Sequence, residues 1–303
     1  MTATPRASAI ARGRAPHRIA LLVRTALATF LLLVAGCPLV DFDGLSGSDP
    51  ATLDGGEDAL VAADASGVPL DGEATSPYAQ SVLEDRPAAY YRFEEATDVG
   101  AARDSSGNGH DAKFVGGVTL GAAGALANEV SRAVRFDGKS GFVRIGDLFH
   151  FRLRAPMSVE VWAKPDLVDG EYRGLISNEP LRSEEQREGY VIFLNAPRGM
   201  GFERFSGGAR AGAVAPAPPL DVYSHVVVTY DGTKARGYVN AIEVLSFDSV
   251  FNMVAAPDAV MTIGARVSGA GGVFAGSLDE VAIYDGALTP ARIAVHYQLG
   301  SGR

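Results

Sequence analysis

The chain has 303 residues, of which 47% are hydrophobic, so it is long enough to bury the core of one large domain or of two small ones. Its formal charge of −9 argues against nucleic acid and against an anionic membrane surface as partners. The single cysteine excludes an internal disulfide and a zinc site built on cysteine thiolates.

Residues 1–36 have the layout of a secretory signal peptide. They carry five arginines and no acidic residue, and they end in a twelve-residue apolar stretch, whereas a membrane-spanning helix needs about 20 residues. The sequence VAGC, which ends at Cys37, resembles the cleavage box of bacterial lipoproteins. The resemblance implies that Cys37 is lipidated and that the protein is exported to the outer membrane or cell surface. The alternative is an ordinary cleaved signal with a chance cysteine.

Residues 37–78 are predicted to form an acidic, disordered tether. Nine Asp and Glu residues fall within 38–77 without any Lys or Arg, and the apolar residues there show no clear period. Charge of one sign and low hydrophobicity favour an extended, solvated linker. The alternative, a calcium-binding acidic tail, is disfavoured because the acids lack the spacing of an EF-hand loop.

Residues 79–300 contain many short strand-like segments separated by turns, which is typical of an all-β domain. Along 157–164 the side chains alternate, and one face is predicted to enter the core; it carries Met157, Val159, Val161 and Ala163. Trp162 falls on the other face and is interpreted as a packing anchor, with ligand stacking as the alternative. The apolar run 225–230 predicts a central strand.

Turn sequences predict three hairpins, which join 134–136 to 142–145, 189–195 to 200–205, and 235–240 to 243–246. The third has Asn240-Ala241 at its turn, where the turn type is left open. A short helix over 289–297 is expected to close the domain, with Thr289 as N-cap and Pro290 at its first position.

The polar turn at 103–111 (RDSSGNGHD) follows YYRFEE at 90–95 and precedes VEVWAKPD at 159–166 and GSLDEVAIYDGALTPARIAVHY at 276–297. In this order the motifs resemble the laminin-G-like, concanavalin A-like jelly-roll family over residues 79–300. The resemblance implies a two-sheet antiparallel jelly-roll sandwich with a short C-terminal helix. It says little about activity, because this fold carries many functions.

The residues of the polar turn taken alone favour a hydrogen-bonded Asx turn, although their clustered oxygen donors are also the kind that calcium prefers. The family resemblance implies a structural calcium ion at this turn. Its ligands would be the side chain of Asp104, the carbonyl groups of Gly107 and His110, and the carboxylate of Asp279. Such an ion would join the two ends of the sandwich.

The sequence gives little support for an enzyme, and no catalytic residue is expected. Some relatives on this fold are glycoside hydrolases, which use paired acids, but Glu160 is followed two positions later by Trp162. Metal-binding histidine spacings and a G-x-S-x-G nucleophile elbow are also missing from the sequence. A glycoside hydrolase or lyase is therefore the least favoured function.

A binding module of the cell envelope is favoured instead. The charged loop 177–188 departs from a minimal sandwich, and binding residues often lie on such loops, although a solvated connector is the alternative. Candidate ligand-binding residues are Tyr172 and Tyr190, which flank the loop, and Arg182 and Arg187 within it. The first hypothesis is recognition of carbohydrate or extracellular matrix. The second is a structural or adhesive domain that binds another protein.

Overall fold

The computed structural model describes residues 76–95, 100–180, 182–254, 256, 258–269 and 271–303. The predicted signal peptide and lipidation site lie outside the described residues, as does nearly all of the predicted tether. Among the described residues, neither helix is long and apolar enough to cross a membrane.

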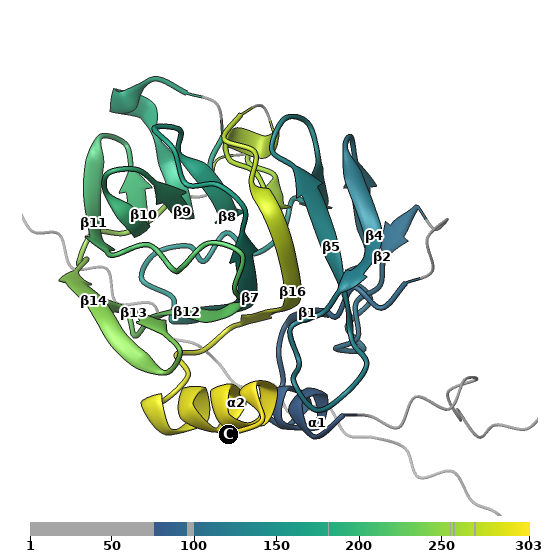
Figure 1. Cartoon of the computed structure of the whole chain (residues 1–303). Helices are drawn as coiled ribbons and strands as arrows, with labels where there is room; N and C mark the ends of the chain where they lie inside the picture. Colours follow the sequence, from purple (N-terminus) through teal and green to yellow (C-terminus); the bar gives the residue numbers. More distant parts are fainter. Residues whose placement is uncertain (1–75, 96–99, 181, 255, 257, 270) are drawn as a thin grey trace, which may run out of the picture. The chain divides into compact units, whose positions relative to one another are not determined.

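Two antiparallel sheets form the domain, as predicted (Figure 1). Sheet A runs in the order β14 (Ile242–Asp248), β13 (Lys234–Val239), β12 (Ser224–Tyr230), β7 (Met157–Pro165), β16 (Ala275–Tyr284), β5 (Arg132–Asp137) and β4 (Val118–Ala123), and β1 (Ala89–Tyr91) also pairs with β16. Sheet B runs in the order β11 (Ala209–Ala215), β10 (Gly199–Ser206), β9 (Glu188–Asn195), β8 (Arg173–Ser177), β15 (Met261–Ile263), β6 (Phe142–Gly146), β3 (Ala112–Val115) and β2 (Ala101–Ala102).

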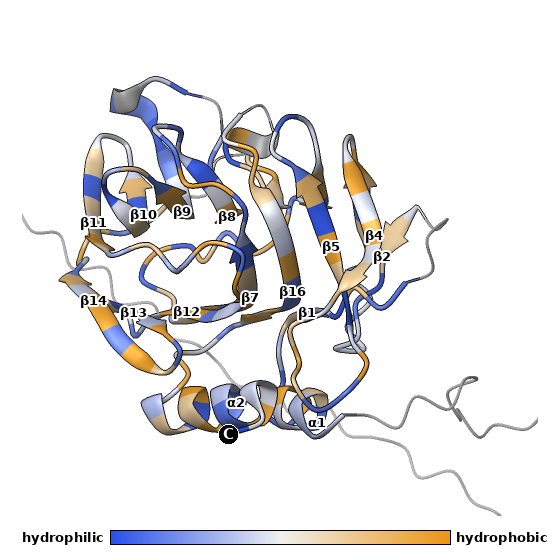
Figure 2. Ribbon diagram, in the orientation of Figure 1, coloured by the Kyte–Doolittle hydropathy of each residue, from blue (hydrophilic) through white to orange (hydrophobic). Residues whose placement is uncertain are grey.

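The main core lies between the two sheets and follows the period of two along each strand. The predicted inner face of β7 is confirmed, because Met157, Val159, Val161 and Ala163 are fully buried in this core. Figure 2 shows the same alternation along β5 as bands of orange and blue. The apolar run 225–230 forms the buried strand β12 between β7 and β13, also as predicted.

Two of the three predicted hairpins are confirmed. Strands β9 and β10 pair around residues 196–198, with Leu194 opposite Met200. Strands β13 and β14 pair around Asn240-Ala241, whose φ angles are 51° and 65°. Positive φ at both central residues describes a type I′ turn, whose twist matches that of the flanking strands.

The predicted hairpin that joins 134–136 to 142–145 is wrong, because β5 and β6 belong to different sheets. The Asp137 side chain closes the turn between them, where its Oδ1 accepts hydrogen bonds from the backbone of Lys139 (2.9 Å), Ser140 (2.8 Å) and Gly141 (2.9 Å). The chain thereby crosses from sheet A to sheet B. The apolar residues of both strands then meet across the core instead of side by side in one sheet.

Two helices cover the outer face of sheet A, and they lie side by side in Figure 1: α1 (Pro77–Glu84) and α2 (Pro290–Ser301). The predicted cap of α2 is confirmed, since the Thr289 hydroxyl accepts the N–H of Arg292 (3.3 Å). Trp162 lies beneath the helices with its ring stacked on Tyr297, which confirms the packing interpretation. Two short 3-10 helices, η1 (Glu184–Gln186) and η2 (Val267–Gly269), lie in connections.

The domain begins earlier than residue 79. Ser76 is the N-cap of α1, where its hydroxyl accepts the N–H of Ala79 (3.0 Å). Tyr78 is almost fully buried between α2 and sheet A. The last residues assigned to the tether are therefore part of the domain. Their burial depends on partners more than 80 residues away, which composition alone does not reveal.

Candidate functional site

The Asp104 side chain closes the polar turn at 103–111. Its Oδ1 accepts hydrogen bonds from the backbone N–H groups of Tyr90 (3.0 Å) and Ser106 (2.9 Å), and its Oδ2 accepts one from His110 (2.9 Å). Burial alone would raise the pKa of Asp104, but these hydrogen bonds outweigh burial and lower it. The charged carboxylate therefore ties the turn to β1.

Asp279 does not lie in the polar turn. It belongs to β16, where its carboxylate accepts hydrogen bonds from the backbone of Ala125 (2.7 Å) and Glu280 (2.9 Å). Strand β1 runs between the two sites, because Tyr91 pairs with β16 on one side and forms an isolated bridge with Asp104 on the other. Three of the four predicted calcium ligands thus share one turn, and Asp279 lies across a strand from them.

This arrangement does not fit the predicted calcium site. Calcium takes about six to eight oxygen ligands, whereas the His110 carbonyl already accepts the Tyr91 hydroxyl (2.6 Å) and the Asp104 carboxylate accepts three N–H groups. Burial, and then the charge of Glu280, raises the pKa of Asp279 well above its ordinary value, which disfavours the charged form that binds a metal. In the described part of the chain, no three acidic, His or Cys side chains converge to hold a metal. Calcium binding stays a prediction.

Tyr190 is a core residue and cannot contact a ligand, so this part of the predicted site is wrong. Its ring is fully buried against Phe151, and its hydroxyl donates to the Phe149 carbonyl (3.1 Å). The physical reason is that side chains alternate between the two faces of β9, and Tyr190 shares the inward face with Ile192 and Leu194.

Tyr172 and Arg187 lie together on the outer face of sheet B. We define the Tyr172 face as Tyr172, Glu179, Arg187, Arg198 and Arg266, over a floor of Phe193 and Phe205. The Tyr172 and Phe193 rings lie 4.9 Å apart between their centres, and the Arg187 guanidinium lies 3.6 Å from the centre of the Phe205 ring. Arg182 instead forms an ion pair with the exposed carboxylate of Asp258.

A glycine makes room for this aromatic floor. Gly201 lies opposite Phe193 in the pairing of β10 with β9. A Cβ atom on Gly201 would lie 2.2 Å from the Phe193 ring, which is far inside van der Waals contact. The Phe193 ring therefore lies flat over the backbone of β10 and supports Tyr172.

The Tyr172 face carries more positive than negative charge. Glu179 is almost fully buried and pairs with both Arg187 (Nε to Oε1, 2.7 Å) and Arg266 (Nη2 to Oε2, 2.9 Å). The guanidinium groups of Arg266 and Arg198 lie 5.1 Å and 5.6 Å from the centre of the Tyr172 ring. One carboxylate thus accompanies three guanidinium groups, which leaves a formal charge of +2 on a chain whose total is −9.

A second cluster of titratable side chains lies between sheet A and α2. Glu160, on the outer face of β7, is fully buried and accepts four hydrogen bonds. Its Oε1 accepts from the Tyr78 hydroxyl (2.6 Å) and from Nε2 of His225 (2.9 Å), and its Oε2 accepts from the Tyr284 hydroxyl (3.1 Å) and from Nδ1 of His296 (2.9 Å). We call these residues, with Asp85, the Glu160 network.

His296 connects two carboxylates in this network. Its Nδ1 faces Glu160 and its Nε2 lies 3.2 Å from Oδ2 of Asp85. Burial alone would lower the pKa of His296, but the charge of Glu160 and then that of Asp85 outweigh burial and raise it. For Glu160, burial is outweighed by the charges and hydrogen bonds of His296 and His225, so its pKa lies below the ordinary range. The network therefore contains a buried histidine–carboxylate pair in which each partner favours the charged form of the other.

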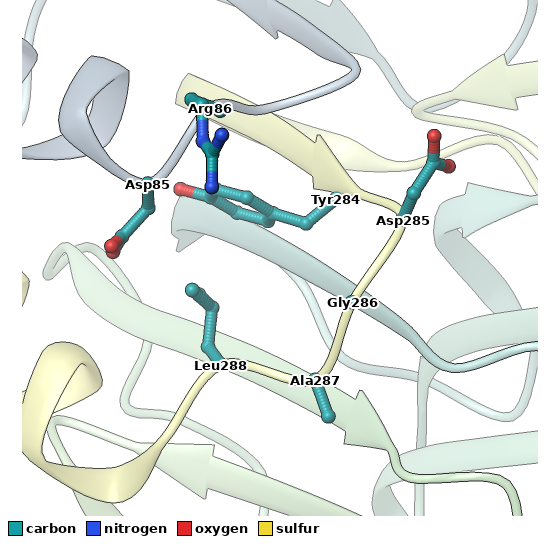
Figure 3. A pocket seen from close by; sticks show the side chains of 7 residues that line it. All are labelled: Asp85, Arg86, Tyr284, Asp285, Gly286, Ala287 and Leu288. Carbon is teal, nitrogen blue, oxygen red and sulfur yellow. The ribbon is translucent and has the colours of Figure 1, made fainter.

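A pocket of about 410 Å³ opens beside the Glu160 network. Asp85 and Arg86, which follow α1, line it together with residues 284–288, which link β16 to α2. Figure 3 shows the hydroxyl end of Tyr284 directed toward Asp85 and Arg86, with Asp285 directed away. Asp85 and Tyr284 therefore join the pocket to the network.

The Glu160 network holds the helices on the sheet, and its central groups are closed to a substrate. Glu160, His225 and His296 have no exposed surface. Asp85 already accepts a hydrogen bond from Nε of Arg292 (2.8 Å) in addition to its contact with His296. Asp85 follows α1, whereas its partners Arg292 and His296 belong to α2. The network therefore fastens the two helices to each other and to sheet A.

Residues 137–294, which are more than half of the 303 residues, match the family model described as "Concanavalin A-like lectin/glucanases superfamily". The two antiparallel sheets described above have the fold of that family. The chain belongs to the concanavalin A-like lectin/glucanases superfamily. The predicted resemblance is thereby confirmed for the β-sandwich domain. A search of curated protein sequences finds no match.

Solved structures share this concanavalin A-like fold at low sequence identity. Domain 4 of AbnA, an extracellular arabinanase from Geobacillus stearothermophilus solved with arabinotriose, is 22% identical, with 70% of this chain and 98% of that domain covered and a TM-score of 0.52. The binding domain of Paraclostridial Mosquitocidal Protein 1 is 14% identical, with 71% and 52% covered and a TM-score of 0.55. The ligand binding domain of botulinum neurotoxin serotype D, solved with N-acetylneuraminic acid, is 12% identical, with 72% and 52% covered and a TM-score of 0.50.

These likenesses show the fold alone, and the match spans about half of each toxin domain. Glu179 lies within the predicted charged loop 177–188 of this concanavalin A-like domain, whereas Arg198 and Arg266 reach the Tyr172 face from two other connections and could not be predicted with it. The role of Glu160 was not predicted either. The available signal was a charged residue between two valines of a strand, which indicates a buried polar partner.

Proposed function

We propose that this chain is an exported carbohydrate-binding module and that it binds glycans through the Tyr172 face. The observation that carries the proposal is the Tyr172 ring, which is partly exposed on the outer face of sheet B, backed by Phe193 and flanked by two guanidinium groups. An aromatic platform with a few fixed polar groups is a suitable surface for a sugar, whose ring has apolar faces and a polar rim.

Two relatives support this class of ligand. The arabinanase domain was solved with arabinotriose and the botulinum neurotoxin domain with N-acetylneuraminic acid. The shared fold supplies a rigid sheet on which such a surface is held in place, because the floor residues Phe193 and Phe205 come from the paired strands β9 and β10.

The leader supports a position at the outer membrane or cell surface. Lipidation of Cys37 would anchor the chain, and the acidic tether would extend because its like charges repel, holding the domain away from the membrane. The module would then meet glycans or matrix outside the cell.

A glycan and polysaccharide binding screen of the purified full chain tests the proposal. We expect binding that Tyr172→Ala abolishes. The matched control is Tyr223→Ala, because Tyr223 is also partly exposed and has a cationic side chain near its ring, Lys164 at 5.7 Å, but packs on the helix side of sheet A. Binding that is unchanged in Tyr172→Ala would contradict the proposed site.

A protein partner is the second candidate, and one observation favours it. Leu153 and Met253 pair through two backbone hydrogen bonds (2.7 Å and 2.8 Å), which places Leu153 near Val254. Leu153 is 63% exposed and Val254 is 58% exposed, and exposed neighbouring apolar residues can mark a protein interface. A negative glycan screen followed by capture of an envelope protein that Leu153→Glu abolishes would favour this adhesive function.

A further inference from the structure

We propose that the Tyr172 face selects glycans that carry carboxylates, such as chains of uronic acids, over neutral glycans. The inference rests on the proposed carbohydrate-binding function and adds the chemical class of the sugar. Three observations lead to it: the uncompensated charge of the face, the placement of two guanidinium groups beside the platform, and the way in which one of them is fixed.

Arg198 carries one of the two uncompensated positive charges. Its side chain is exposed at the turn between β9 and β10, and within the described part of the chain no carboxylate lies within ion-pair distance of it. Other arginines of the domain do pair with acids, as Arg173 does with Asp169 and Arg135 with Asp166. An exposed guanidinium beside an aromatic ring, in a chain of net charge −9, is a local site for an anion.

Arg266 is held in place by a buried partner. Its guanidinium donates to both oxygens of Glu179, at 3.3 Å and 2.9 Å from Nη2. Because Glu179 also pairs with Arg187, its single negative charge is shared between two cations, and the pair of arginines keeps a net positive charge. A guanidinium that is already immobilised loses little side-chain entropy when it binds a ligand.

The geometry favours a carboxylate as the group that these arginines recognise. Arg198 and Arg266 both lie over the Tyr172 ring within 6 Å of its centre, so a sugar bound at Tyr172 would meet both guanidinium groups. A guanidinium presents paired N–H donors that match a carboxylate, and hydrogen bonds between charged partners are stronger than neutral ones. A neutral hydroxymethyl group would use only part of this donor set.

The experiment compares two forms of one polysaccharide, polygalacturonate and its fully methyl-esterified form, which differ in charge and keep the same sugar backbone. Affinities of the full chain would be measured by calorimetry at low and high salt. We expect the acid form to bind about tenfold more tightly at low salt, and the preference to shrink as salt rises because exposed charges are screened.

Variants separate this inference from the proposed function. Arg198→Gln should weaken binding of the acid form more than that of the ester, so that the ratio of the two affinities collapses. Arg154→Gln is the control, because Arg154 is exposed on a different loop and its replacement changes the net charge equally. An unchanged ratio in Arg198→Gln, or equal affinity of the wild type for both forms, overturns the selectivity. Absence of all glycan binding overturns the proposed function as well.

Discussion

Glu160 shows how one side chain can organise four elements. It has no exposed surface, yet it accepts bonds from α1, β12, β16 and α2 through Tyr78, His225, Tyr284 and His296. A buried carboxylate is costly unless it is paired and its oxygens are satisfied, and both conditions hold here. We therefore interpret it as the residue that fastens the helices to sheet A.

Replacing Glu160 with Gln should destabilise the fold strongly, because the buried His296 loses the fully buried one of its two carboxylate partners. Removing one member of a buried ion pair costs about 3–5 kcal/mol in the free energy of unfolding. Urea unfolding of the wild type and the variant measures the difference. Glu243→Gln is the control, since Glu243 is exposed on β14 and its loss should change stability by less than about 0.5 kcal/mol.

The Glu160–His296 pair predicts a pH dependence of the free energy of unfolding. The lowered pKa of Glu160 gives stabilisation that is present above about pH 4.3, the unfolded value, and is lost as the pH falls toward the folded value. The raised pKa of His296 gives stabilisation that is complete below about pH 6.5 and is lost as the pH rises through the folded value. We expect a maximum between these limits that flattens in Glu160→Gln. Parallel pH profiles for the two proteins would contradict this role.

At the scale of elements, the polar turn at 103–111 acts as a clamp on β1. Asp104 bonds to the backbone of β1, and Asn108 donates to the carbonyl groups of Pro87 and Ala88 (both 3.1 Å) just before it. The turn therefore fixes the short strand that lines one edge of β16. These hydrogen bonds hold the turn to β1, whereas the predicted calcium ion would join the turn to Asp279.

Replacing Asp104 with Ala should lower the free energy of unfolding by about 3 kcal/mol, because three backbone N–H groups lose their acceptor and Tyr90 is buried. Ser105→Ala, in the same turn, is the control and should have a small effect. Thermal melts in calcium and in EDTA should coincide for the wild type. A melting temperature that falls in EDTA for the wild type but not for Asp104→Ala would instead support the predicted calcium ion.

At the scale of the whole molecule, the chain combines a predicted export leader and tether with a concanavalin A-like domain. The leader predicts lipidation at Cys37, and about two or three acyl chains give stable membrane attachment where one is marginal. Metabolic labelling of the full chain in a bacterial host with a palmitate analogue should give a labelled protein, and Cys37→Ser should abolish the label. A wild-type chain that stays unlabelled would exclude the anchor and leave an ordinary exported protein.

Tyr172 and Tyr190 show how far the sequence could define the Tyr172 face. Both flank the charged loop and were equivalent candidates by position. The pairing of β9 with β8 and β10 decides which of its side chains face inward, and Tyr190 is one of them. Tyr172 precedes β8 and lies outside the core. The loop itself contributed Glu179 and Arg187 to the face, and Arg198 and Arg266 came from turns that the sequence did not connect with it.

The sequence by itself determined the features that depend on neighbouring residues. These are the strand pattern of the sandwich, the inner face of β7, the 189–205 hairpin and the capped C-terminal helix, because side-chain period, turn residues and caps act over a few positions. Tertiary structure decided which sheet takes β5 and β6, where Asp279 lies, and that Glu160 meets His296 across 136 positions of sequence. Those outcomes depend on which surfaces the two sheets bury against each other, and a local pattern is compatible with more than one such arrangement.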